Sequence, residues 1–382
     1  MDERPRRIML VASSAKPGGA ERALVSLARR LPATGWDATA VLLEDGPLAS
    51  WLADATCPTV VLPGHRTRDL RRTAGTIRQL TRLVMSSQAD VVLSSLVKTH
   101  IFSGLAAIRS RRPAVLWEQG IPEERRWSKG GIMVQLATSI PKKRVVVSCD
   151  DALAAVRRFT HAPTEKIPPG IDVDAVAAAS GSGAPIRAAL GWEDRTVVGI
   201  VGRLQEWKGQ MVFLRAASAL TRARPDLRFC IVGGSILGWE KSYERDVHAY
   251  AAQDPALAGK VHFAGHQDDA YAWMDALDVV VHASFGEPFG LVVVEAMALA
   301  KPLVATAGGG PSEIVEEGVS GLLVPQRDPE AIVGAVLRIL DEDGLAGHLR
   351  RGGPIRARDF TETAMAVRFS KMLDDLVPAA RV

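Results

Sequence analysis

The chain has 382 residues, of which 47% are hydrophobic and 24% charged, and its formal net charge is +4. This length predicts two domains, or at most three, and this composition is typical of soluble globular proteins. The small net charge and the lack of a nucleic-acid-reading motif argue against a nucleic-acid partner.

The cysteines and the N-terminal segment indicate the compartment. Cys57, Cys149 and Cys230 lack the spacing of metal ligands, and an odd count without a secretion signal favours a reducing environment. The charged segment 1–7 leads directly into an apolar run, without the apolar region of a signal peptide. No apolar run is long enough to span a bilayer. We therefore expect a cytoplasmic protein, with association to the cytoplasmic face of a membrane as an alternative.

The first half of the chain alternates short apolar runs with helical patterns. The expected strands are 8–12, 38–43, 59–62, 91–94, 114–117 and 144–148, and the expected helices are 20–31, 47–54, 68–86, 99–109, 131–138 and 150–159. This repeated order predicts a parallel sheet with helices on both faces, as in Rossmann-like domains. We assign the first domain to residues 1–168.

Paired glycines lie between the first strand and the first helix, in the segment 17–22 (PGGAER). The segment is not G-x-G-x-x-G, so the dinucleotide-binding fingerprint is absent. Gly18 and Gly19 before a helix start still favour an open turn whose backbone N–H groups can bind an anion. A plain connecting loop is the alternative.

Polar residues follow later strands of this domain. Glu118 and Gln119 come directly after a strand and begin the charged segment 118–129, which includes Trp127. Together with His100 they are candidates for the acceptor side of a site, while a helix-start or surface position is the alternative for His100. The basic clusters at 66–72 and 109–112 are interpreted as solvated faces, or as contacts for an anionic acceptor or membrane.

A linker divides the chain at 166–172, where two prolines and a glycine interrupt the pattern. Asp172 and Asp174 resemble a metal-binding D-x-D pair, but they lie in this linker without a third oxygen ligand, so we predict no metal site. Strands are expected at 197–201, 229–232, 261–264, 279–282 and 303–306, and helices near 208–222, 241–252, 268–275, 289–299, 311–317, 328–340, 343–351 and 361–377. We assign a second Rossmann-like domain to 169–358 and a final helical segment to 359–382.

Basic residues follow the first strand of the second domain. Gly202-Arg203-Leu204 leaves the strand, and Lys208-Gly209 opens the next helix. Arginine offers a planar fork of donors and lysine a point charge, and both suit phosphate. With a helix N-terminus beside them they can neutralise a diphosphate without Mg²⁺. Surface charge is the alternative.

Two glutamates stand in the segment 284–296 (SFGEPFGLVVVEA), which follows the strand 279–282. Seven residues separate Glu287 from Glu295, so a helix starting near 288 or 289 places Glu295 about two turns in. Both carboxylates then border a crevice at the carboxyl end of a parallel sheet, where such sheets bind ligands. Glycines in this loop allow close approach of the backbone to a ligand.

Taken together, these motifs resemble glycosyltransferase family 4, a group of retaining sugar-nucleotide transferases with the GT-B fold. The resemblance covers nearly the whole chain and rests on segments 18–22, 202–209, 287–295, 309–313 and 318–324. It implies two Rossmann-like domains facing a cleft, with the final helix crossing back to the first domain. The first domain is then expected to bind the acceptor and the second the nucleotide sugar.

The resemblance also implies roles for residues. Arg203 and Lys208 hold the diphosphate, Glu287 meets the sugar hydroxyls, and Glu295 meets the ribose. The backbone of Gly202, Phe289, Gly290 and Leu291 contributes to donor binding, and the loop at Gly18 and Gly19 closes over it. Relatives often place a histidine at a strand end of the first domain, where this chain has Ser95 or Trp117-Glu118-Gln119.

The sequence therefore predicts a metal-independent hexosyltransferase that uses a UDP-type donor and needs no cofactor. The acceptor is either a cell-envelope or lipid-linked glycan or a small natural product such as an antibiotic core. A non-hydrolysing sugar-nucleotide epimerase and a non-catalytic sugar-nucleotide-binding protein are the alternatives.

Overall fold

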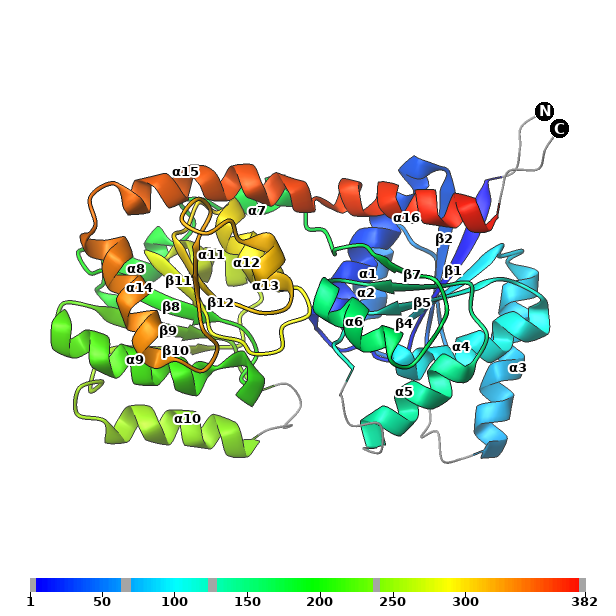
Figure 1. Ribbon diagram of the computed structural model, residues 1–382, viewed down its shortest axis with the longest axis horizontal. Coiled ribbons are helices and arrows are strands. Elements are labelled where there is room, and N and C mark those ends of the chain that lie inside the picture. The colour runs from blue at the N-terminus through cyan, green and yellow to red at the C-terminus, as the bar shows by residue number, and fades with distance from the viewer. Residues whose placement is uncertain (1–4, 63–69, 123–128, 236–240, 378–382) are drawn as a thin grey trace. The chain divides into compact units, whose positions relative to one another are not determined.

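The computed structural model describes residues 5–62, 70–122, 129–235 and 241–377. The chain divides into two compact units. Unit 1 comprises Met1–Ile171 with Thr361–Val382, and unit 2 comprises Asp172–Phe360. Both units contain a parallel sheet flanked by helices (Figure 1), which confirms the predicted doubly wound α/β architecture.

Unit 1 contains a seven-stranded sheet in the order β3-β2-β1-β4-β5-β6-β7. Its strands are β1 (Arg6–Ala12), β2 (Trp36–Leu42), β3 (Thr59–Val61), β4 (Val91–Ser95), β5 (Ala114–Glu118), β6 (Arg144–Val147) and β7 (Thr164–Lys166). Its helices are α1 (Gly19–Arg30), the 3₁₀ turn η1 (Leu31–Thr34), α2 (Pro47–Asp54), α3 (Leu70–Ser86), α4 (Val97–Ser110), α5 (Lys129–Ser139), α6 (Asp150–Arg157) and α16 (Glu362–Leu376).

Alternate residues of β1 supply two hydrophobic cores. Ile8 and Leu10 pack with residues of α1, α2 and α16, whereas Met9 and Val11 pack with residues of α3 and α4. Successive side chains of a strand point to opposite faces, so a continuous apolar run fits a sheet that is buried on both faces. Cys57, Cys149 and Cys230 are all free and buried.

The last helix, α16, belongs to unit 1 although it follows unit 2 in the chain. Its first residue, Glu362, is only 3% exposed and accepts hydrogen bonds from Ser26 Oγ at 2.7 Å, Arg29 at 2.8 Å and Arg30 at 2.9 Å. All three partners lie on α1, so a buried carboxylate fixes α16 to α1. Phe369 adds an edge-to-face contact with Trp117 at 4.8 Å between ring centroids.

Unit 2 contains a six-stranded sheet in the order β10-β9-β8-β11-β12-β13. Its strands are β8 (Val197–Val201), β9 (Arg228–Val232), β10 (Val261–Gly265), β11 (Val279–His282), β12 (Leu303–Thr306) and β13 (Leu322–Val324). Its helices are α7 (Val173–Ala177), α8 (Ala184–Leu190), η2 (Glu206–Lys208), α9 (Gln210–Ala223), α10 (Lys241–Gln253), α11 (Ala270–Asp275), α12 (Leu291–Ala298), α13 (Gly310–Ile314), α14 (Pro329–Asp341), α15 (Leu345–Ala357) and η3 (Arg358–Phe360).

Several elements differ from the sequence prediction. The short strands β7 and β13 were not predicted, and neither were helices α7 and α8, which follow the expected linker 166–172. Asp172, the first acid of the D-x-D pair, caps α7 by accepting a hydrogen bond from Ala175 N–H at 3.0 Å. Its carboxylate therefore has a structural role at a helix start.

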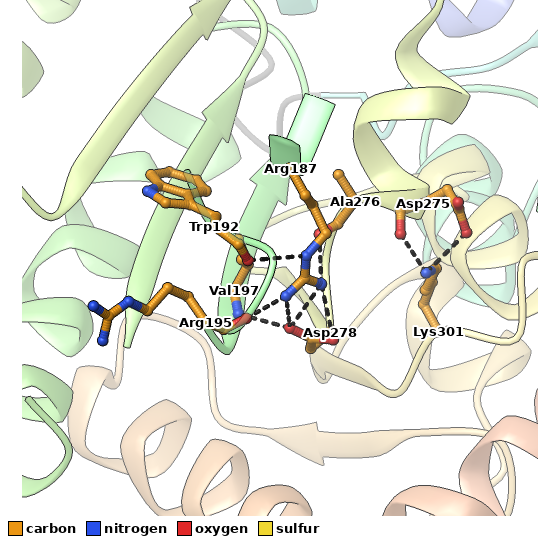
Figure 2. A network of polar contacts seen from close by, with 8 residues as sticks. All are labelled: Arg187, Trp192, Arg195, Val197, Asp275, Ala276, Asp278 and Lys301. Carbon is orange, nitrogen blue, oxygen red and sulfur yellow. Dashed lines mark hydrogen bonds and ion pairs between the residues drawn. The ribbon is translucent and has the colours of Figure 1, made fainter. Parts of the chain in front are cut away.

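A polar network fastens α8 to the amino edge of the second sheet (Figure 2). Asp278, which precedes β11, accepts hydrogen bonds from the Arg187 guanidinium at 3.1 Å and from Val197 N–H at 2.8 Å. Nearby, Lys301 Nζ lies 2.9 Å from Asp275, which also accepts from Gly181 and Gly183 N–H. This edge is opposite the carboxyl ends of the strands, so the network holds the unit together away from the candidate site.

Candidate functional site

The candidate site of unit 2 lies where β8 and β11 end. These strands are neighbours and run parallel, with Val279 paired to Val198, so the loops that follow them leave the same edge of the sheet. The loop after β8 contains Arg203 and leads through η2 to Lys208, and the loop after β11 contains Glu287. Two segments that are far apart in sequence therefore meet at this edge.

Lys208, Glu287 and His282 form a compact buried cluster. Lys208 Nζ lies 2.5 Å from Glu287 Oε2, and His282 Nε2 lies 3.2 Å from the same oxygen. The side chains of Glu287 and His282 are 8% and 4% exposed. Burial alone would raise the pKa of Glu287, but the charge of Lys208 and the hydrogen bond with His282 hold that pKa well below its usual range. Glu287 is therefore a carboxylate.

The backbone of Glu287 is fixed by the start of α13. Gly310 N–H donates to the Glu287 carbonyl at 2.9 Å. Gly309 has a φ of +59°, and a Cβ at this position would clash with the same carbonyl oxygen. The glycine loop before α13 therefore packs against the backbone of Glu287.

Close packing also sets the position of Lys208. Gly209 has a φ of +78°, and a Cβ at this position would clash with the carbonyl oxygen of Ala283. Phe285 N–H donates to the Trp207 carbonyl at 2.8 Å, which joins the two loops through their backbones. The Lys208 ammonium lies 4.0 Å from the centroid of the Trp207 ring, a cation–π contact.

The remaining predicted donor residues surround this cluster. Arg203 is half-buried, and its carbonyl accepts from Gln210 Nε2 at 2.7 Å. Helix α12 begins at Leu291 after Gly290, whose φ is +98°, and no side chain caps it. Glu295 therefore lies little more than one turn into the helix, and not two, with its carboxylate 3.3 Å from the Tyr271 hydroxyl. Phe289 is buried against Phe360.

In unit 1 the strand ends carry a second set of polar groups. Glu118 ends β5, is 5% exposed and accepts hydrogen bonds from Gly120 N–H at 2.8 Å and Val97 N–H at 3.1 Å. Burial raises the pKa of Glu118 to about 7, despite these two hydrogen bonds. Gln119 Nε2 donates to Ser95 Oγ at 3.2 Å. A carboxyl group thus joins the ends of β4 and β5.

The turn held by Glu118 has an unusual backbone. Leu96 adopts φ +70° and ψ 154°, a conformation that is strained for any residue with a side chain. Its N–H donates to the Trp117 carbonyl at 2.9 Å. Strain of this kind persists only where surrounding contacts enforce it, and it is concentrated at functional sites. The start of α4 is therefore a candidate site in its own right.

The other unit 1 candidates differ in accessibility. His100 is fully buried, with Nδ1 2.8 Å from Ser94 Oγ and no partner for Nε2 within the described residues. Burial, followed by the charge of Lys142, lowers the pKa of His100 to about 4, so the ring is neutral. Gly18 precedes α1 in an extended conformation, and Gly19 begins the helix. Trp127 lies outside the described residues.

His282 and Tyr271 were not singled out from the sequence. His282 is the one polar side chain in the run Val279–His282, and a polar residue that closes an apolar strand is the signal that would have found it. Tyr271 lies on α11, and nothing in its local pattern connects it with Glu295. Among the described residues no group of three or more His, Cys, Asp or Glu is placed to hold a metal ion. No described helix has the length and apolarity required to cross a bilayer.

Two family models match the chain. The model described as Glycosyltransferase Family 4 matches residues 17–175, and that described as Glycosyl transferases group 1 matches residues 195–342. A D-inositol 3-phosphate glycosyltransferase of Corynebacterium jeikeium is 34% identical over 219 residues, which cover 56% of this chain and 52% of the relative. The chain thus spans about half the length of the curated relatives it matches.

Solved structures match almost the whole chain. HepE of Anabaena in complex with UDP and glucose superposes with a TM-score of 0.85 and 25% identity, covering 96% of this chain and 99% of that one. The same protein in complex with UDP-glucose gives a TM-score of 0.85 and 25% identity, covering 97% and 99%. The architecture of both units is therefore that of the GT-B fold.

Proposed function

We propose that this chain, whose two halves match the models described as Glycosyltransferase Family 4 and Glycosyl transferases group 1, is a retaining glycosyltransferase. It transfers a hexosyl group, such as glucose or N-acetylglucosamine, from a UDP-type nucleotide sugar to a hydroxyl group. The observation that carries this proposal is the cluster of Lys208, Glu287 and His282 where β8 and β11 end. It combines a cation for phosphate with an ionised carboxylate for sugar hydroxyls. The UDP bound to HepE supports the choice of nucleotide.

Arg203 and Lys208 bind the diphosphate and stabilise the negative charge that develops on it as the bond to the sugar breaks. Glu287 accepts hydrogen bonds from sugar hydroxyls, and Glu295 accepts them from the ribose. Backbone N–H groups at the start of α12, beside Gly290 and Leu291, add donors for the anion. Two basic side chains supply the charge neutralisation that a divalent metal supplies elsewhere, so we propose transfer without added metal or cofactor.

In the proposed reaction the acceptor oxygen bonds to the anomeric carbon on the face from which the diphosphate leaves. The bond between that carbon and the phosphate oxygen breaks, and the departing phosphate takes the acceptor proton. No protein nucleophile is required, so catalysis consists of positioning and electrostatic stabilisation. The configuration at the anomeric carbon is retained.

We assign acceptor recognition to the strand ends of unit 1. Glu118 and Gln119 bind acceptor hydroxyls there, beside the strained turn at Leu96. His100 contributes indirectly, because its ring is buried against Ser94. The acceptor is a cell-envelope or lipid-linked glycan, or a small natural product.

The outer helices of unit 1 favour contact with an anionic membrane. Helices α3, α4 and α5 contain basic residues and no acidic ones, and Met85 and Leu136 on them are 64% and 60% exposed. We propose peripheral association through this face. Binding to phosphatidylglycerol vesicles, but not to phosphatidylcholine vesicles, tests it by cosedimentation, and equal binding to both contradicts it.

The function is tested by incubating the protein with UDP-glucose, UDP-N-acetylglucosamine and UDP-galactose and measuring thermal shifts. A bound donor raises the melting temperature by mass action. Transfer to candidate acceptors is then measured in the presence of EDTA. Failure to bind any nucleotide sugar refutes the proposal, and interconversion of donors without an acceptor would indicate an epimerase instead.

A further inference from the structure

The Glu287 carboxylate has two partners that differ in burial. His282 ends β11, is 4% exposed and is paired in register with Ala305 of β12, so its imidazole is held by the sheet. Lys208 is 18% exposed, and its ammonium stands at the end of a four-carbon stem. Both contact the same oxygen, Oε2. His282 is therefore enclosed by the sheet, whereas Lys208 carries its charge on a longer and more exposed side chain.

The contacts of His282 set the direction of its hydrogen bond with Glu287. Glu287 is ionised and accepts hydrogen bonds only, so His282 Nε2 carries the hydrogen. His282 Nδ1 is buried without a partner among the described residues. The imidazole thus orients Glu287 through one N–H bond, while Lys208 supplies the charge.

We propose that His282 is a positioning residue that fixes the Glu287 carboxylate for the donor sugar, while Lys208 turns from that carboxylate to the diphosphate. This inference rests on the proposed function. If His282 and Lys208 act in this way, the affinity for the sugar depends on His282 and the affinity for the nucleotide depends on Lys208.

Calorimetric titration with UDP, UDP-glucose and UDP-N-acetylglucosamine tests whether recognition of the sugar and of the nucleotide depends on different residues. The measured quantity is the ratio of the Kd for UDP to the Kd for the tighter of the two nucleotide sugars. His282→Gln places an amide N–H near the position of Nε2 and retains the ratio. His282→Asn reaches only the position of Nδ1 and lowers the ratio about tenfold, the usual effect of losing a hydrogen bond to a charged group. The Kd for UDP itself changes by less than about twofold.

Lys208→Gln is the matched control, and it weakens binding of UDP and of the nucleotide sugar by the same factor. A double-mutant cycle with Glu287→Gln separates positioning from a general structural effect. In the Glu287→Gln background, His282→Asn has no further effect on the ratio. Titrations are made below the lowest melting temperature of the set, so that all variants are folded.

Three results overturn the inference. An unchanged ratio in His282→Asn shows that His282 does not act on the sugar. Equal weakening of UDP binding and of nucleotide-sugar binding in that variant shows that His282 supports the structure of the whole site. Equal affinity of the unmodified protein for UDP and both nucleotide sugars shows that Glu287 does not bind the sugar, although nucleotide binding stands. Failure of the unmodified protein to bind UDP or either sugar refutes the proposed function itself.

Discussion

Lys208 and Glu287 approach within 2.5 Å although 79 positions separate them in the chain. Lys208 ends the 3₁₀ turn η2 that follows β8, and Glu287 lies in the loop after β11, so the contact exists because these strands are neighbours in the sheet. This contact places the ammonium group proposed to bind phosphate beside the carboxylate proposed to bind sugar hydroxyls. The first prediction tests this pair.

Replacing Lys208 with glutamine is expected to weaken UDP binding by about tenfold or more, because a charge-assisted contact to phosphate is lost. The same change leaves the Glu287 carboxylate buried without its cation, which lowers the melting temperature. Lys208→Arg retains the charge and is expected to retain most of the affinity. Calorimetry and thermal melting measure both effects, and undiminished UDP affinity in Lys208→Gln would exclude a phosphate contact.

Glu118 is expected to make stability depend on pH. Its pKa is raised from 4.5 to about 7, so between these values the folded protein holds a proton that the unfolded chain has released. The free energy of unfolding therefore decreases as pH rises through this window, by about 3 kcal/mol for a shift of this size. The contribution is fully present below pH 4.5.

Denaturant titrations of the unmodified protein and Glu118→Gln between pH 4 and 8 measure this effect. Glutamine does not titrate, so the difference in unfolding free energy between the two proteins should change with pH across the window. Other titrating groups cancel in that difference. A difference that is constant from pH 4 to 8 would show that Glu118 titrates alike in both states.

Gly309 is expected not to tolerate a side chain. Alanine at Gly309 must adopt a φ of +59°, and its Cβ clashes with the Glu287 carbonyl oxygen. Alanine at Gly318 must adopt a φ of +73°, but its Cβ has open space around it. Gly318→Ala is expected to cost about 1–2 kcal/mol of unfolding free energy. Gly309→Ala should cost more and should also weaken nucleotide-sugar binding. Equal effects of the two changes would contradict the packing described here.

Loss of the Glu362 carboxylate is expected to detach α16. Glu362→Ala leaves Arg29 and Arg30 without their shared partner and removes a buried acceptor from Ser26, at a cost of about 3 kcal/mol. Glu330→Ala is the matched control, since it is also in the first turn of a helix, α14, but is exposed. Chemical denaturation measures both, and similar small losses would refute the role assigned to Glu362.

The network around Asp278 is expected to stabilise unit 2 without affecting its site. Asp278→Ala removes the acceptor of both Arg187 and Val197 N–H, and should lower the unfolding free energy by about 1–3 kcal/mol. Because the network lies at the amino edge of the sheet, the Kd for UDP should be unchanged at temperatures where the variant is folded. A large change in that Kd would show that the two edges are coupled.

The fold could largely be predicted because most strands are apolar runs of four or more residues that alternate with helical patterns. Strand β7 consists of Thr164, Glu165 and Lys166, so it has no apolar pattern, and β13 is an apolar run of only three residues. Helices α7 and α8 were missed because small residues and prolines around them are also typical of a linker.

The positions of the candidate site residues could be predicted from the sequence, but the contacts between their side chains could not. Placement of Lys208 and Glu287 at strand ends follows from the order of elements. Their direct contact, and the contact of His282 with the same carboxylate, depend on which strands are neighbours and on close packing at Gly209 and Gly309. The strain at Leu96 has no local signature either, because leucine is an ordinary residue at a helix start.

The position of α16 has a consequence for the order in which the chain folds during synthesis. Every residue of unit 2 leaves the ribosome before Glu362 and Phe369, so unit 2 can complete its sheet while unit 1 still lacks the helix that covers one of its hydrophobic faces. Until α16 docks, Trp117 lacks its contact with Phe369, and Ser26 of α1 lacks its hydrogen bond to Glu362. Unit 1 begins first and is completed last, which makes it the part of the nascent chain that most needs protection from aggregation.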